Sequence, residues 1–177
     1  MEKVALITGA SRRIGKTTCE TLHRAGYRVV IHYLSSKDEA EALSAALNES
    51  RPRSAITAQA DLHSESEIEN LVSTVIDAFG RLDLLVNNAS TFYPTALGDV
   101  SAQHWLELMG SNLKAPLFLS KFAAPSLQQT RGCIINIIDI YADRPLSNHH
   151  IYTAAKAGLA NLTKSLARDL APAVRVN

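Results

Sequence analysis

Lys3 to Gly15 reads KVALITGASRRIG, and this stretch decides the fold. The apolar run at 3–8 is typical of a buried parallel strand. The remainder predicts a tight turn that opens a helix, in which Gly9 lets the chain turn sharply and Gly15 lets the helix lie close to the strand. Free backbone N–H groups at such a helix start can hold a dinucleotide pyrophosphate. Taken alone, the stretch fits a plain strand–turn–helix connection equally well, because the usual GxGxxG spacing is not satisfied.

The same order of strand and helix continues along the chain. Strands are predicted at 3–8, 28–33, 54–59, 82–86, 133–138 and 173–177, and helices at 14–25, 37–49, 65–79, 101–128 and 152–170. This alternation requires right-handed crossovers and a parallel sheet covered on both faces. The predicted fold is α/β, a Rossmann-type doubly wound parallel sheet in three layers (α/β/α). We expect the strand order 3-2-1-4-5-6, with the ligand at the carboxyl ends of the strands. The sequence contains no repeat or low-complexity linker, so residues 1–177 are interpreted as one domain.

Composition narrows the possible partners. Of the 177 residues 46% are hydrophobic, which suffices for one sizeable core. Eighteen basic and seventeen acidic residues give a net charge of +1, which argues against nucleic acid and anionic membranes as partners. Cys19 and Cys133 are interpreted as buried free thiols, and neither a disulfide nor a metal site is expected. Because no apolar run approaches a membrane span and the chain starts with a strand, we expect a cytoplasmic protein.

Tyr152 and Lys156 lie four residues apart on one face of a predicted helix. A tyrosine hydroxyl with a pKa of about 10 is a poor acid or base at neutral pH. A neighbouring ammonium favours the phenolate, so we expect Lys156 to lower the pKa of Tyr152. The pair alone is weak evidence, since this spacing also occurs by chance on amphipathic helices.

Further segments precede this pair in a fixed order. NNAS at 87–90 follows the strand at 82–86, Asp61 and Leu62 follow the strand at 54–59, Asn112 lies in the long predicted helix, and Asp139 follows the strand at 133–138. Together with Tyr152 and Lys156, they resemble the short-chain dehydrogenase/reductase family from Val4 to the last residue.

Two departures from the common family pattern indicate a subfamily. Arg13 replaces the middle glycine of TGxxxGxG, and Asp139 replaces the serine that usually partners the catalytic tyrosine. These residues, the segment at 88–94, His32-Tyr33 and the segment at 40–62 are similar to pteridine reductases. The resemblance implies hydride transfer from NADPH to a C=N bond of a dihydropterin or dihydrofolate. It also implies a homotetramer built partly from the helices at 101–128 and 152–170.

The resemblance also implies roles for individual residues. Tyr152 would donate the proton, Lys156 would hold the nicotinamide ribose, Asp139 would accept a hydrogen bond from Tyr152 or pass it a proton, and Asn112 would join a proton relay. Pro116 would kink the long helix and free a carbonyl there. Substrate contacts are expected from Arg13, Ser90, Phe92, Asp139 and Tyr152. Cofactor contacts are expected from Gly9, Arg13, Ile14, Gly15, His32, Tyr33, Ser35, Ser36, Asp61, Leu62, Asn88, Ala89, Ser90, Tyr152 and Lys156.

The choice of NADPH also follows from the residues themselves. NAD-binding sheets place an acidic residue at the end of the second strand, whereas this chain has no carboxylate between His32 and Lys37. A 2′-phosphate would meet Ser36, Lys37 and either Arg12 or Arg13. Ser35 stands where related pteridine reductases often carry arginine. Ser35 and Ser36 would equally suit a helix N-cap.

Alternatives remain for the site and for the function. Phe92 would otherwise fill a loop core, Arg13 would be solvated, Asp139 would cap a loop, and Asp61 would end a strand. His149 and His150 are interpreted as exposed loop residues. A carbonyl or 3-oxoacyl-thioester reductase is the second hypothesis, and an inactive or nucleotide-binding-only relative is the third. In the family a Pro-Gly loop and a substrate lid follow the sixth strand, so we expect a truncated or incompletely recorded chain.

Overall fold

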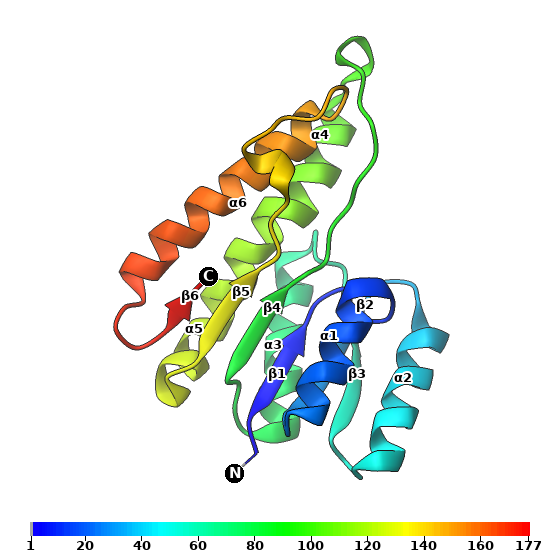
Figure 1. Ribbon diagram of the computed structural model, residues 1–177, viewed down its shortest axis with the longest axis vertical. Helices are drawn as coiled ribbons and strands as arrows, with labels where there is room; N and C mark the ends of the chain where they lie inside the picture. The colour runs from blue at the N-terminus through cyan, green and yellow to red at the C-terminus, as the bar shows by residue number, and fades with distance from the viewer. Residues whose placement is uncertain (1) are drawn as a thin grey trace.

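The computed structural model describes residues 2–177 and contains a single six-stranded sheet (Figure 1). All five strand pairs are parallel. The order β3-β2-β1-β4-β5-β6 confirms the predicted topology, and the direction of winding reverses between β1 and β4. The strands are β1 Val4–Ile7, β2 Arg28–Tyr33, β3 Ala55–Gln59, β4 Leu84–Asn87, β5 Cys133–Asn136 and β6 Arg175–Val176.

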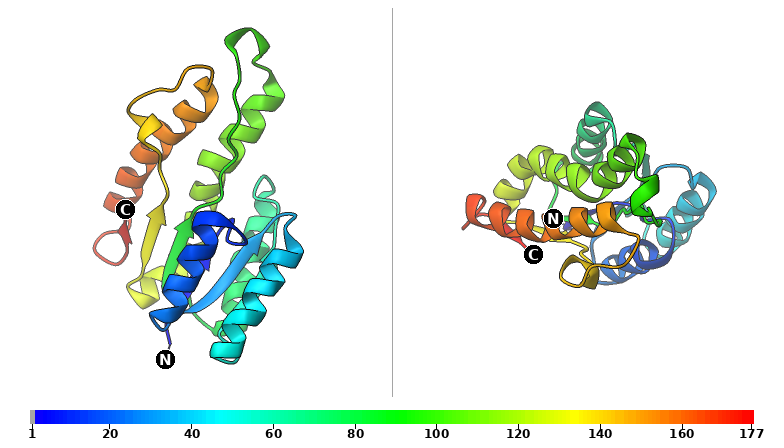
Figure 2. Two further views of the ribbon diagram at one scale, coloured as in Figure 1. Left: turned by 45° about the vertical axis from the view of Figure 1, so that its right-hand side comes forward. Right: turned by 90° about the horizontal axis from the view of Figure 1, so that it is seen from above.

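Helices cover both faces of this sheet (Figure 2). The principal helices are α1 Arg13–Arg24, α2 Lys37–Ser50, α3 Glu65–Phe79, α4 Ala102–Met109, α5 Ala115–Thr130 and α6 His150–Asp169. Successive strand residues point to opposite faces. Ile7 and Ile31 therefore pack with Cys19 of α1 and Leu43 of α2 in one buried cluster.

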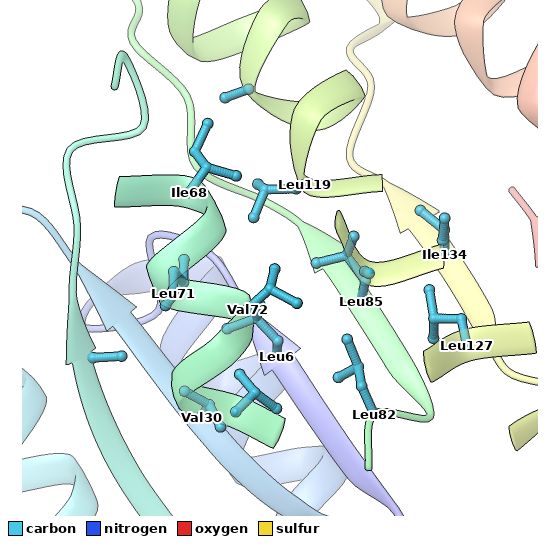
Figure 3. Packing of buried hydrophobic residues seen from close by; sticks show 14 of the residues in the cluster. Leu6, Val30, Ile68, Leu71, Val72, Leu82, Leu85, Leu119, Leu127 and Ile134 are labelled. Atoms are coloured by element: carbon cyan, nitrogen blue, oxygen red, sulfur yellow. The ribbon is translucent and has the colours of Figure 1, made fainter. Parts of the chain in front are cut away.

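The cluster on the other face joins the strands to α3 and α5 (Figure 3). Leu6 and Leu85 from the sheet, Ile68 from α3 and Leu119 from α5 are at most 1% exposed. Truncating a fully buried leucine in such a core costs roughly 2–5 kcal/mol. This packing fixes the position of the strand ends that carry the site.

The thiols partly match expectation. Both cysteines are free, and Cys19 is buried whereas Cys133 is only half-buried. Burial, with a smaller contribution from Glu20, raises the pKa of Cys19 to about 12. Cys19 is therefore an inert core thiol.

The helix predicted at 101–128 is interrupted. A π-helical segment, η2 Gly110–Lys114, separates α4 from α5. Pro116 has no N–H, so a carbonyl one turn earlier lacks its helical donor. The interruption begins at Gly110, where the His63 ring packs so closely that a Cβ would lie 2.4 Å from Cδ2 of His63. Pro116 predicted a disruption, but the contact with His63 was not visible in the sequence.

The segment after β5 also differs from the prediction. β5 ends at Asn136, so Asp139 lies in a turn and precedes the short helix η3 Ile140–Ala142. Another short helix, η1 Leu97–Asp99, precedes α4. In Figure 1 the loops before α4 and α6 extend past the carboxyl ends of the strands. Within residues 2–177, no helix is both long and apolar enough to cross a membrane.

Candidate active site

The glycine turn after β1 is locked to the ends of β2 and β4. Gly9 has a left-handed φ of +59°, and its N–H donates to Nδ1 of His32 at 3.0 Å. A Cβ on Gly15 would lie 2.3 Å from the Gly9 carbonyl oxygen. Asn88 donates from Nδ2 to the carbonyl of Thr8 at 2.8 Å, and the Thr8 hydroxyl accepts from the Asn88 and Ala89 N–H groups. Thr8 was not among the predicted site residues, although it stands directly before Gly9.

Arg13 occupies a backbone position that favours glycine. Its φ is +52°, in the left-handed region, where a residue with a Cβ pays roughly 1–2 kcal/mol. This conformation gives a physical reason for the glycine that the common family pattern has here. The Arg13 side chain lines the cleft described next.

A cleft of about 370 Å³ opens along the carboxyl ends of the strands. Its wall includes thirteen residues that the sequence predicted for cofactor binding: Gly9, Arg13, Ile14, Gly15, His32, Tyr33, Ser35, Ser36, Asp61, Leu62, Asn88, Ala89 and Ser90. Tyr152 and Lys156 are not in this wall. Ser90 connects this wall to Tyr152, because a hydrogen bond between the two side chains is among the contributions to the pKa of Tyr152.

The cleft suits a dinucleotide phosphate. At the start of α1, Arg12 makes no side-chain capping hydrogen bond within the described chain, so N–H groups of the first helical turn are open to an anion. Ser36 likewise makes no capping bond at the start of α2 within residues 2–177. Arg12 is paired with Glu39, and Lys37 Nζ lies 3.6 Å from Glu41. A 2′-phosphate would have to compete with Glu39 for Arg12.

Asp61, which lies in the cleft wall, is held by hydrogen bonds to two neighbouring residues. Its backbone N–H donates to Glu67 at 2.7 Å, and its carboxylate accepts from the N–H and Nδ1 of His63, each at 2.9 Å. The hydrogen bond from the His63 backbone N–H, followed by the one from the His63 side chain, lowers the pKa of Asp61. His63 also contacts the Glu107 carbonyl at 3.1 Å, so it links the cleft to α4. No sequence pattern pointed to His63, because only the fold brings residues 63 and 107 together.

Asp139, Tyr152 and Lys156 meet beside the cleft. The Tyr152 hydroxyl donates to Oδ2 of Asp139 at 2.7 Å, and Oδ1 of Asp139 accepts from the Tyr141 N–H at 3.0 Å. Lys156 donates from Nζ to the carbonyl of Ile137 at 2.9 Å. The Lys156 ammonium lies 5.8 Å from the centre of the Tyr152 ring, and both residues are 4% exposed.

The expectation that Lys156 lowers the pKa of Tyr152 is wrong for this arrangement. Burial raises the pKa of Tyr152, and the hydrogen bond to Asp139 and its negative charge raise it further. Burial also opposes ionisation of Asp139, but the bonds from Tyr152 and Tyr141 and the charge of Lys156 prevail and lower its pKa. Burial lowers the pKa of Lys156 to about 8, although the charge of Asp139 acts against this. The site therefore holds a neutral phenol beside a carboxylate.

Asn112 is buried in η2 and has its whole side chain engaged. Nδ2 donates to the carbonyls of Leu108 and Thr91, each at 2.9 Å, and Oδ1 accepts from the Ser90 hydroxyl at 2.7 Å. Asn112 thus joins the loop after β4 to the interrupted helix. Because its side chain is engaged, Asn112 could take part in a proton relay only through its backbone carbonyl. Pro116, four residues later, has no N–H to occupy that carbonyl.

Phe92 lies beside Tyr152 and directly follows Thr91 of the cleft wall. It is 52% exposed and meets the Tyr152 ring edge-on with 4.8 Å between centroids. His149 stacks on Phe92 with centroids 4.6 Å apart and an interplanar angle of 16°. The Thr95 N–H donates to the Asn148 carbonyl at 2.5 Å, which ties the two loops together. His149, expected as an exposed loop residue that brushes the substrate, is thus part of an aromatic cluster with Phe92 and Tyr152.

The described residues contain no group of three or more His, Cys, Asp or Glu side chains that could hold a metal ion.

Comparisons with known proteins agree with this geometry. Residues 3–177 match the family model described as short chain dehydrogenase. The chain is 41% identical to pteridine reductase 1 of Leishmania tarentolae over 98% of its length and 74% of that protein. It is 36% identical to the 3-oxoacyl-[acyl-carrier-protein] reductase FabG of Staphylococcus epidermidis over 97% of its length and 70% of the relative. The 3-oxoacyl-[acyl-carrier-protein] reductase of Synechocystis is also 36% identical, over 96% of the chain and 68% of the relative. With the sheet, the glycine turn and the Tyr152–Lys156 pair in place, this oxidoreductase belongs to the short-chain dehydrogenase family.

Proposed function

We propose that the protein is an NADPH-dependent pteridine reductase that reduces a C=N bond of a dihydropterin. One observation carries the proposal: a carboxylate, Asp139, accepts the hydrogen bond from the Tyr152 hydroxyl at 2.7 Å. A carboxylate can also accept hydrogen bonds from the N–H groups of a nitrogen heterocycle, which a ketone cannot offer. The 41% identity to a pteridine reductase supports the same substrate class.

Tyr152, Asp139 and Lys156 have different roles in the proposed proton transfer. Tyr152 is neutral and carries the proton that goes to the ring nitrogen. Once it has given up this proton, the phenolate would lie against the Asp139 carboxylate, which is unfavourable unless a proton returns quickly. A proton from solvent would return to the phenolate by way of the Asp139 carboxylate, which accepts the hydrogen bond from Tyr152, and the buried Lys156 ammonium would offset the negative charge. The pair therefore acts as a coupled acid and not as two independent groups.

The hydrogen-bond donors that line the cleft suit the phosphate groups of NADPH. The open N–H groups of α1 suit a pyrophosphate, and the Tyr33–Ser36 edge offers hydroxyls and no carboxylate to a 2′-phosphate. When bound, NADPH would supply the hydride from C4 to the carbon of the C=N bond. Lys156 would hold the nicotinamide ribose hydroxyls, and Asn112 would hold the loop after β4 in place.

We expect Phe92 and polar residues of the cleft wall to recognise the substrate. Phe92 presents an exposed ring next to Tyr152, which suits stacking on a flat heterocycle. Ser90 and Arg13 would meet the polar edge of the pterin, because both line the cleft. Dihydrofolate, which has the same ring, is a further expected substrate.

A 3-oxoacyl-thioester reductase is the second candidate. Its support is the 36% identity to two 3-oxoacyl-[acyl-carrier-protein] reductases over nearly the whole chain. Asp139 and Arg13 count against it, since the common family pattern has serine and glycine there. A chain that binds nucleotide without turnover is the third candidate.

Assembly into a homo-oligomer, with a tetramer as the preferred form, is part of the proposal. Trp105 of α4 and Leu117 of α5 are 51% and 41% exposed. Large apolar side chains on these two helices suit burial against another subunit. Size-exclusion chromatography with light scattering distinguishes monomer from tetramer.

The function is tested by NADPH oxidation at 340 nm with dihydrobiopterin. NADH and a 3-oxoacyl thioester are run in parallel. Oxidation that requires the pterin and prefers NADPH supports the proposal. Turnover of the thioester alone would replace it with the second candidate. NADP⁺ binding without turnover of either substrate would favour the third.

A further inference from the structure

His32 holds the turn that forms the phosphate end of the cleft. It lies near the end of β2 and is 2% exposed. Nδ1 accepts from the Gly9 N–H at 3.0 Å, and Nε2 contacts the Ala60 carbonyl at 3.0 Å. The His32 carbonyl accepts from the Ala10 N–H at 2.8 Å. One residue thus joins the ends of β1, β2 and β3.

Its two partners permit only one form of the ring. The Gly9 N–H can only donate and the Ala60 carbonyl can only accept, so Nδ1 must be bare and Nε2 must carry the proton. A second proton on Nδ1 would set N–H against the Gly9 N–H. Burial lowers the pKa of His32, and the bond to Ala60 opposes this only in part. The ring is therefore neutral at pH 7.

We propose that His32 is a positioning residue whose neutral, Nε2-protonated ring holds the glycine turn in its cofactor-binding shape, so that acid weakens dinucleotide binding through His32. The inference rests on the proposed binding of NADP(H) in this cleft. It does not require His32 to touch the cofactor. His32 accepts the hydrogen bond of the Gly9 N–H and so fixes the turn. The N–H groups of the first turn of α1 are then the ones that meet the phosphates.

Other titratable groups line the same cleft. Arg12 and Arg13 lie on the α1 side, Tyr33 follows His32, and Asp61 and His63 follow β3. Within residues 2–177, none of them exchanges a hydrogen bond with the His32 ring. The 2′-phosphate of the cofactor can itself titrate near pH 6. The test therefore compares variants and does not rely on the wild-type profile alone.

Isothermal titration calorimetry with NADP⁺ between pH 5 and 8, on wild type and two His32 variants, distinguishes the roles of the two ring nitrogens. His32→Asn places an amide oxygen near the position of Nδ1 and cannot titrate, whereas His32→Gln places its amide near Nε2. At pH 7.5 we expect His32→Asn to bind within about threefold of wild type and His32→Gln at least about tenfold more weakly. Below the His32 pKa, wild type should lose up to about tenfold more affinity per pH unit than His32→Asn.

His23→Gln is the matched control. His23 is another buried histidine, 6% exposed, and burial, with the charge of Arg51, lowers its pKa. It pairs with Ser54 at 2.6 Å, near the start of β3 and away from the cleft. This variant should alter acid unfolding and leave the NADP⁺ Kd at pH 7.5 unchanged.

Parallel pH profiles for wild type and His32→Asn would overturn the inference, as would equal Kd values for the Asn and Gln variants. Nitrogen-15 spectra of wild-type His32 test it without cofactor. A bare Nδ1 with a protonated Nε2 at pH 7.5 supports it, and a protonated Nδ1 overturns it. If wild type binds no NADP⁺ at any pH, the cofactor proposal fails and these spectra decide the role of His32 in the turn.

Discussion

Replacing Lys156 by methionine should stabilise the fold while it removes activity. Lys156 is 4% exposed, and burial lowers its pKa from 10.5 to about 8. At about 1.4 kcal/mol per pH unit, keeping this group charged at pH 7 costs about 3 kcal/mol. Methionine preserves the apolar stem but loses the hydrogen bond to the Ile137 carbonyl, a loss of about 1 kcal/mol. We therefore expect the free energy of unfolding to rise by about 2 kcal/mol.

The sign of the pH dependence follows from the same values. Between about pH 8 and 10.5 the unfolded chain binds a proton at Lys156 that the folded chain has released, so stability contributed by this residue rises with pH. From pH 7 to pH 10 the cost of the buried charge falls by about 2 kcal/mol. The advantage of Lys156→Met over wild type should shrink by that amount.

Urea unfolding at pH 7 and pH 10 measures both effects. Lys164→Met is the control, because Lys164 is an exposed lysine on the same helix and should give little change at either pH. NADPH oxidation with dihydrobiopterin is measured on the same samples. A Lys156→Met protein that is less stable than wild type at pH 7, or a stability difference that does not depend on pH, would refute the reasoning.

Substitutions at four further residues test single groups. Tyr152→Phe removes the transferable proton, so kcat on dihydropterin should fall at least about 100-fold while the NADP⁺ Kd stays within about twofold; substantial turnover would contradict the assignment. Asp139→Ser should reduce dihydropterin turnover about tenfold more than thioester turnover, and equal losses would make Asp139 structural. Arg13→Gly relieves a left-handed backbone, so urea unfolding should show a gain of about 1 kcal/mol alongside a higher KM for dihydropterin; unchanged stability would speak against backbone strain. His149→Ala should raise that KM about fivefold with kcat nearly unchanged, since a stacked aromatic pair is worth about 1 kcal/mol, and His149→Tyr should restore it unless the stack is incidental.

The sequence predicted the sheet well because its signals are local. Six apolar runs alternate with helical segments, and the glycine turn marks the first crossover, so the order of the strands follows from general rules of handedness. The close approach at Gly15 could also be anticipated, since a Cβ there would collide with the Gly9 carbonyl. Most residues of the cleft wall follow from strand ends, which have to lie along one edge of the sheet.

Features that depend on packing could not be predicted in this way. The close packing of the His63 ring on Gly110 joins residues that lie 47 positions apart in the chain. The pKa of Tyr152 was expected to fall because Lys156 lies four residues away on the same helix. It rises because the fold buries the phenol, and because the hydrogen bond to Asp139, which the family resemblance did predict, raises the pKa further. The stacking of His149 on Phe92 likewise joins two loops that are far apart in the sequence.

Deuterium transfer in a mixed reaction tests the central claim most directly. NADPH carrying deuterium at both C4 positions is incubated with the protein and equal concentrations of dihydrobiopterin and a 3-oxoacyl thioester. Mass spectrometry then measures the deuterium content of each product. The proposed chemistry predicts one deuterium on carbon in the tetrahydropterin and little in the hydroxyacyl thioester. Deuterium found only in the hydroxyacyl thioester would contradict it.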